Sequence, residues 1–152
     1  MTVHGSQTLP PGSYGKIDVK ANAILSLTGG DYCFTSLKVG SHGQFRAFAP
    51  SAVHITGRMS VSQGAYVGPE MTTGLAAHDV AIWVAGQDGP ANSGTAFETA
   101  HGVAVHANVS AFNATLTLGV GNVGVGAFQG KRVRIGNDTT LVLDSTMDYP
   151  YP

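Results

Sequence analysis

The chain has 152 residues, enough for one domain with a continuous apolar core but short for two. Its formal charge is −1 and only 11% of its residues are charged, so it lacks a basic surface for a phosphate backbone and we expect no nucleic-acid partner. Hydrophobic residues make up 43% of the chain, yet no run approaches the roughly 20 residues of a membrane-spanning helix, so we expect no membrane span.

The predicted elements are all strands. Glycine recurs throughout, β-branched residues are frequent, and no long window carries apolar residues at helical spacing. Short segments instead alternate apolar and polar residues with a period of two, which indicates half-buried strands. We expect strands, in chain order, at 17–19, 24–27, 32–39, 45–48, 53–55, 59–61, 80–84, 103–105, 116–118, 123–125, 133–135 and 141–143.

An internal repeat favours a solenoid over an antiparallel sandwich. Residues 17–25, 103–109 and 133–141 each join two short apolar strands through a polar turn that contains Asn22, Asn108 or Asn137. One such turn cannot bury its apolar side alone, so several must stack with their strands parallel. We therefore predict an all-β, single-domain right-handed parallel β-helix over 1–152, with a lead-in or cap at 1–13, coils at 14–144 and a tail at 145–152.

Two segments break the repeat between about 68 and 102. Residues 68–74 and 86–94 are rich in Gly and Pro and are predicted to project as loops. Between them lies the strand at 80–84, which carries the single tryptophan. Loops that leave a solenoid on one side are where binding would sit, so we predict a ligand site. Its candidate residues are Trp83, Gln87, Asp88 and Asn92.

Parts of the sequence resemble known bacterial β-helices. Residues 53–68 and 120–144, above all Gly126–Gly136, resemble bactofilins, which are polymer-forming bacterial β-helices, whereas 9–15 and 25–34 are similar to β-helical domains of secreted or surface-attached bacterial proteins. The resemblance implies a passive rod that polymerises end to end. The insertions at 68–102 and the Pro-rich start depart from a regular bactofilin core.

Cysteine and histidine give no clear metal site. Cys33 is the only cysteine, so the chain has no intrachain disulfide and no zinc-binding thiolate cluster, and its alternation with Tyr32 and Phe34 places it on the side of the strand opposite these rings. The six histidines show no HxH or HExxH spacing, although stacked coils could still align them in a surface ladder. We expect no cofactor and no metal. The histidines are His4, His42, His54, His78, His101 and His106.

No residue set supports catalysis convincingly. Asp79, Asp88 and Glu98 flank the predicted loops, but each is explained more simply as a cap, turn or loop residue, and we expect no enzyme. The Gly-rich stretch 119–126 lacks the following helix that a phosphate loop needs. The basic cluster 131–134 sends Arg132 and Arg134 to the same side of a strand, where a solvated surface is the simplest role and an acidic polymer or a neighbouring subunit are alternatives.

The expected function is structural. We predict a β-solenoid that self-associates into filaments or a surface assembly, with itself as the main partner, and the alternative is a cell-surface module that binds a polysaccharide or another surface protein. The C-terminal residues Tyr149, Pro150, Tyr151 and Pro152 are candidates for self-association, or else form a disordered tail. A surface of Ser, Thr, Asn, Gly and Ala favours an extracellular or cell-surface location, with the cytoplasm as the alternative. The first residues show no signal peptide, which a processed form would also lack.

Overall fold

A computed structural model describes residues 1–90 and 94–143, which form a parallel β-solenoid of about seven turns. Every strand pairing between described residues is parallel, and the one helical element is the short 3₁₀ helix η1 (Ala77–Asp79). The predicted parallel solenoid is confirmed and the antiparallel sandwich is excluded. The strands are β1 (Thr2–Val3), β2 (Ser6–Leu9), β3 (Gly12–Val19), β4 (Ile24–Leu27), β5 (Gly30–Val39), β6 (Gln44–Ala47), β7 (Ser51–Ile55), β8 (Met59–Val61), β9 (Tyr66–Pro69), β10 (Val80–Val84), β11 (Phe97–Thr99), β12 (Ala104–His106), β13 (Asn108–Leu118), β14 (Val123–Val125), β15 (Phe128–Ile135) and β16 (Thr140–Val142).

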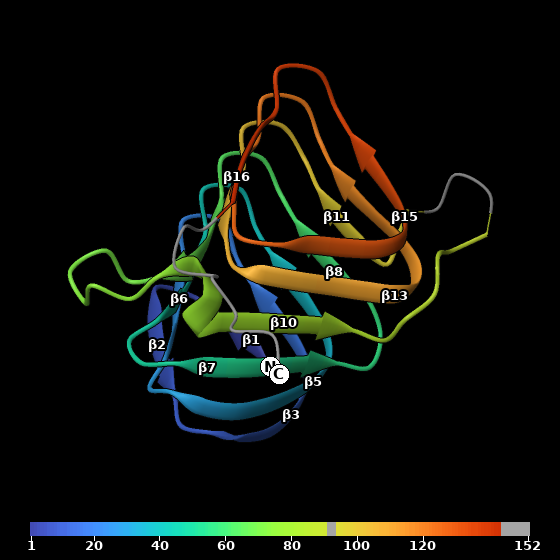
Figure 1. Cartoon of the computed structure of the whole chain (residues 1–152). Helices are drawn as coiled ribbons and strands as arrows, with labels where there is room; N and C mark the ends of the chain where they lie inside the picture. The colour runs from blue at the N-terminus through green and yellow to red at the C-terminus, as the bar shows by residue number, and fades with distance from the viewer. Residues whose placement is uncertain (91–93, 144–152) are drawn as a thin grey trace, which may run out of the picture.

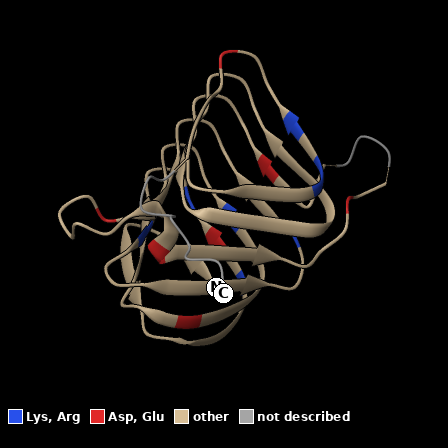
Figure 2. Cartoon of the chain, viewed as in Figure 1, with Lys and Arg blue, Asp and Glu red and all other residues tan. Residues whose placement is uncertain are grey.

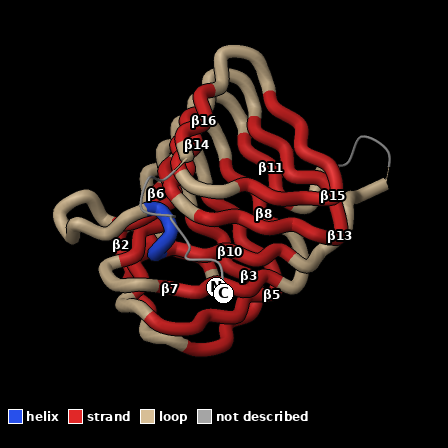
Figure 3. The backbone as a smooth tube through the Cα atoms, in the orientation of Figure 1, coloured by secondary structure: helices blue, strands red, loops and turns tan. Residues whose placement is uncertain are grey.

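Each complete turn of the solenoid has three faces (Figures 1 and 3). The first face consists of β7, β10 and the N-terminal parts of the long strands β3, β5, β13 and β15. The second face consists of β1, β8, β11 and the C-terminal parts of the same long strands. The third face is a separate seven-stranded sheet of β2, β4, β6, β9, β12, β14 and β16. In Figure 1 the colour changes from blue to red along the stack of turns.

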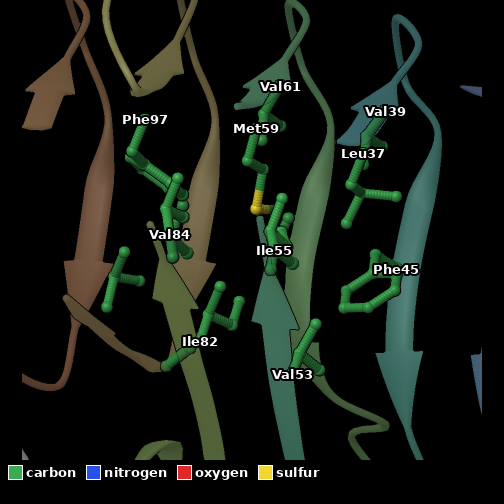
Figure 4. Packing of buried hydrophobic residues seen from close by; sticks show 14 of the residues in the cluster. Leu37, Val39, Phe45, Val53, Ile55, Met59, Val61, Ile82, Val84 and Phe97 are labelled. Atoms are coloured by element: carbon green, nitrogen blue, oxygen red, sulfur yellow. The ribbon is translucent and has the colours of Figure 1, made fainter. Parts of the chain in front are cut away.

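Alternation along each strand builds the core. Because all pairs are parallel and in register, residues at the same position in successive turns form rows that point either into the solenoid or out to solvent. Figure 4 shows part of the core, where the three faces meet around a common apolar interior. One inward row on the first face contains Tyr32, Val53, Ile82 and Val109, each at most 1% exposed.

The corner between the second and third faces repeats in nearly every turn. One residue in each tight turn has a left-handed backbone. In five of these turns its N–H donates a hydrogen bond to the next turn, as from Asn22 to the Ser41 carbonyl (3.0 Å) and from His42 to the Gln63 carbonyl (2.9 Å). These bonds carry the parallel ladder around the corner. The left-handed residues are Gly5, Asn22, His42, Gly64, Gly102, Gly121 and Asp138.

The predicted repeat contains one misalignment. Asn22 and Asn137 lie in the turn between the second and third faces, whereas Asn108 begins β13 at the next corner of the solenoid. Its side-chain carbonyl accepts the Ala127 N–H of the next turn at 3.0 Å. Short strands have similar sequences on all three faces, so the predicted repeat equates turns that lie at two different corners.

The start of the chain already forms paired strands. Residues 1–13, predicted as a lead-in or cap, contain β1, β2 and the beginning of β3. β1 pairs with β3 and β2 pairs with β4, all in the same register as later turns. Regular stacking therefore begins ahead of Tyr14.

The first predicted loop and the described part of the second project from the stack (Figure 1). The first joins β9 to β10 and contains η1, and the second joins β10 to β11. The strand between them is β10, with the same bounds as the prediction for 80–84. These loops enlarge one turn without breaking the ladder, since β10 still pairs with β7 and β13.

Candidate functional site

Trp83 belongs to an outward row on the first face. Cys33, His54, Trp83, Ser110 and Gln129 occupy equivalent positions on β5, β7, β10, β13 and β15. The sequence predicts that Cys33 points away from Tyr32 and Phe34, and the structure confirms it, because both rings are buried whereas Cys33 is partly exposed.

The indole of Trp83 stacks on the imidazole of His54. Their ring centroids are 4.7 Å apart and the rings are inclined by only 11°. This separation follows from the spacing of about 4.8 Å between neighbouring strands, which sets side chains of one row beside each other. Trp83 is 38% exposed, so its ring remains accessible from solvent.

A hollow of about 330 Å³ lies beside Trp83, over β10, β13 and β15. β13 and β15 are on the side of Trp83 opposite β7, which carries His54. The hollow is therefore next to the ring face that His54 does not cover. Its lining residues are His78, Ala81, Trp83, Asn108, Ser110, Ala127 and Gln129.

Asp88, predicted both as a candidate ligand residue and as a cap, turn or loop residue, fastens its loop to the solenoid. Its carboxylate accepts the backbone N–H groups of Ala96 (3.1 Å) and Thr115 (3.0 Å) and the Thr115 hydroxyl (2.7 Å). Thr115 follows the irregularity in β13 at Ala111–Thr115. Although desolvation acts to raise it, the pKa of Asp88 is held below its ordinary value by these hydrogen bonds.

Of the predicted ligand residues that the structure describes, only Trp83 lines the hollow. Neither Gln87 nor Asp88 lines the hollow beside the indole, and Gln87 is exposed elsewhere on the loop. Asn92 lies outside the described residues. The neighbours of Trp83 are instead His54, Ser110, Asn108 and Gln129, which sequence reasoning missed. Strand register alone brings them together, and no sequence motif signals that register.

A second polar surface surrounds Tyr66 on the third face. The Tyr66 hydroxyl donates to the Pro69 carbonyl at 2.6 Å, and its ring meets His106 edge-on at 5.4 Å. Hollows of about 300 and 250 Å³ flank it, one beside Arg46 and the other beside His106, under the loop that begins at Glu70. Burial raises the pKa of Tyr66 to about 12 and lowers the pKa of His106. The phenol therefore stays protonated near neutral pH.

A fourth hollow, of about 510 Å³, lies on the second face. Lys38, Arg58 and Glu98 contribute both signs of charge to its lining. Charged residues are otherwise sparse and scattered over the turns (Figure 2).

The acidic residues considered for catalysis do not converge. The Asp79 carboxylate accepts the Ala76 N–H at the start of η1, and the Glu98 carboxylate accepts the Thr95 N–H, both at 2.9 Å. With Asp88 in its anchoring role, all three serve local structure, as the sequence suggested. Among residues 1–90 and 94–143, no three His, Cys, Asp or Glu side chains are grouped so that they could hold a metal ion.

The last turn leaves part of the apolar core exposed. Val133 and Ile135 on β15 occupy the rows of Leu116 and Leu118, which are at most 1% exposed, but are themselves 43% and 52% exposed. Leu141 on β16 follows Val105 and Gly124 in its row and is 42% exposed. Within the described chain, β15 pairs only with β13, and β16 only with β14.

The first turn is closed by contrast. Val3 is fully buried and Leu9 is only 5% exposed, although both belong to the end turn. The Gln7 amide contacts the Met1 sulfur at 3.2 Å, and the N-terminal amine donates to the Lys16 carbonyl. Side chains of the first turn thus cover its own core.

The remaining predicted residues are placed as follows. Arg132 and Arg134 pair with Thr115 and Thr117 of β13, so both project outward from β15, as expected. Gly119–Gly126 forms a corner followed by β14, without a helix. Tyr149, Pro150, Tyr151 and Pro152 lie outside the described residues.

Comparison with protein-family models, curated proteins and solved structures found no match to this chain. The resemblance to bactofilins therefore stays a prediction from the sequence. In the described residues, no helix is both long and apolar enough to span a membrane.

Proposed function

We propose that this chain is a structural β-solenoid that associates with a second copy of itself through its last turn. The observation that carries the proposal is the exposure of Val133, Ile135 and Leu141, which occupy rows that are buried in earlier turns. Leu143 beyond them is 70% exposed. Covering these side chains removes apolar surface from water, which is the main driving force for association.

The backbone of the last turn supports the same proposal. Each strand there has one edge with no partner among the described residues, and such an edge offers free N–H and C=O groups to another chain. A second copy supplies both an apolar end and matching strand edges, so one contact satisfies both requirements.

The difference between the two ends favours contact between like ends. The first turn covers its own core with Met1 and Gln7, so it offers little apolar surface to the last turn of another copy. Two last turns present the same apolar surface to each other, which gives a closed two-fold dimer. A filament would need a further contact at the N-terminal end.

Two neighbouring residues of β16 allow a matched test. Leu141 points inward in its row, and Val142 points outward in the row of His106 and Val125. Their exposures are similar, at 42% and 49%. Light scattering after size exclusion should give twice the 15.6 kDa chain mass for wild type and Val142→Lys, and a single chain mass for Leu141→Lys.

The folded state of both variants is checked by circular dichroism and thermal melting, because Leu141 also packs over Gly124. A wild-type chain that remains monomeric up to millimolar concentration would contradict the proposal. Equal dimerisation of the two variants would contradict it as well.

A further inference from the structure

We propose that the hollow beside Trp83 binds a neutral sugar ring, at a site independent of the proposed association of last turns. His54 covers one face of the indole. On the other side, the row continues with Ser110 and then Gln129. Trp83 and Gln129 lie two strand spacings apart, roughly 9.6 Å. Because the Ser110 side chain between them is small, this distance leaves a slot for one ring stacked on the indole.

The floor and edges of this slot suit a ring with hydroxyl groups. Ala81 and Ala127 are small and keep the floor open. Ser110 and Gln129 have no side-chain hydrogen-bond partner in the part of the chain that the structure describes. The side-chain carbonyl of Asn108 accepts the Ala127 N–H, which leaves the side-chain NH₂ group of Asn108 to donate. Three polar side chains can therefore bond to hydroxyl groups at the edge of a ligand.

The charge of the slot argues for a neutral ligand. Its lining contains no Lys, Arg, Asp or Glu. His78 at the rim lies 3.5 Å from the carboxylate of Asp79, which balances any charge on the imidazole. A charged ligand would lose hydration here without gaining an opposite charge.

A pyranose ring fits all of these features. It has an apolar C–H face that packs on an aromatic ring, and its hydroxyl edge meets amide and hydroxyl groups. The volume of about 330 Å³ is at the lower end of the range of roughly 300–1,000 Å³ for small-molecule sites, which suits one ring of a longer chain.

The single tryptophan of the chain makes the test direct, because intrinsic indole fluorescence reports on this site alone. The full chain is titrated with glucose, galactose, mannose and N-acetylglucosamine and with their neutral oligomers. At least one of these sugars or its oligomers should give a saturable change in the fluorescence of Trp83. Isothermal calorimetry on the same sugar then supplies an affinity for variants that lack the indole.

Three variants separate the slot from the general surface. Trp83→Ala removes the platform, and Ser110→Phe fills the slot while keeping Trp83, so each should weaken binding about tenfold or more. Ser13→Phe adds the same ring at the far end of the same outward row, beside Cys33, and should bind like wild type. Circular dichroism checks that all three are folded.

Absence of a saturable response to every neutral sugar up to about 100 mM would overturn the proposal. Full binding by Ser110→Phe, or equal loss in Ser13→Phe, would overturn it too. Binding of only charged sugars would contradict the argument from charge. None of these outcomes depends on oligomeric state, which light scattering measures separately.

Discussion

The Asp88 carboxylate joins the loop after β10 to a strand 27 residues further along the chain. A polar residue between Gly and Pro in a projecting loop suggests ligand binding, and the sequence analysis assigned it that role. In the structure Asp88 anchors its loop, and the Thr115 N–H that its carboxylate accepts follows an irregularity in β13. Nothing in the sequence near Asp88 indicates that partner.

We predict that Asp88→Asn destabilises the fold by about 1 kcal/mol at pH 7, since the amide loses the charge and one acceptor. Because the pKa of Asp88 is lower in the folded chain, its contribution is present above the unfolded value of about 3.9 and is lost as pH falls through the folded value. Urea unfolding from pH 7 down to pH 2.5 measures this, and the difference between wild type and variant should shrink at the acidic end.

Asp31→Asn is the matched control, because Asp31 is exposed and makes no side-chain hydrogen bond to the described residues. It should change stability by less than about 0.5 kcal/mol. An equal effect of both substitutions would show that the anchoring bonds of Asp88 contribute nothing.

At the scale of elements, short strands with apolar residues two apart were predictable. The segments 24–27, 59–61, 80–84 and 123–125 have the bounds that alternation predicts. β2, β9 and β11 were missed because Ser, Gln, Gly, Pro or Glu interrupt their apolar pattern. Neighbouring turns complete these strands, and this long-range pairing leaves no local signal.

The corner between the first and second faces depends on close backbone approach. A Cβ at Gly86 would lie 2.1 Å from the Gly57 carbonyl oxygen, and a Cβ at Gly57 would lie 2.5 Å from the Thr35 carbonyl oxygen. The Gly86 N–H donates to the same Gly57 oxygen at 3.0 Å. Glycine is therefore required here by the distance between turns.

We predict that Gly86→Ala destabilises the chain by about 1–3 kcal/mol, because the contacting atoms are backbone and cannot move aside. Gly15→Ala is the control, since nothing lies within 4 Å of its added Cβ, and it should be close to neutral. Chemical denaturation of both variants gives the comparison. A neutral Gly86→Ala would contradict the described packing of this corner.

At the scale of the whole molecule, the two ends of the described solenoid differ in how far their apolar side chains are exposed. Composition and repeats predicted the stacking, and hence that two ends exist, but they did not distinguish the ends. The difference comes from Met1 and Gln7 covering the first turn and from Val133, Ile135 and Leu141 lying exposed in the last. Such differences depend on which row each residue occupies, which requires the register of all the turns.

The measurement that tests the proposed association most directly is pulsed electron–electron double resonance between chains that each carry one spin label in a Cys33→Ser background. Thr140→Cys and Ser6→Cys place the label at opposite ends of the same outward row of the third face. We expect an inter-chain distance below about 40 Å for labels at Thr140, and none below about 60 Å for labels at Ser6, because the stacked turns are about 4.8 Å apart. A short distance between labels at Ser6, or no inter-chain signal at Thr140 at millimolar concentration, would contradict it.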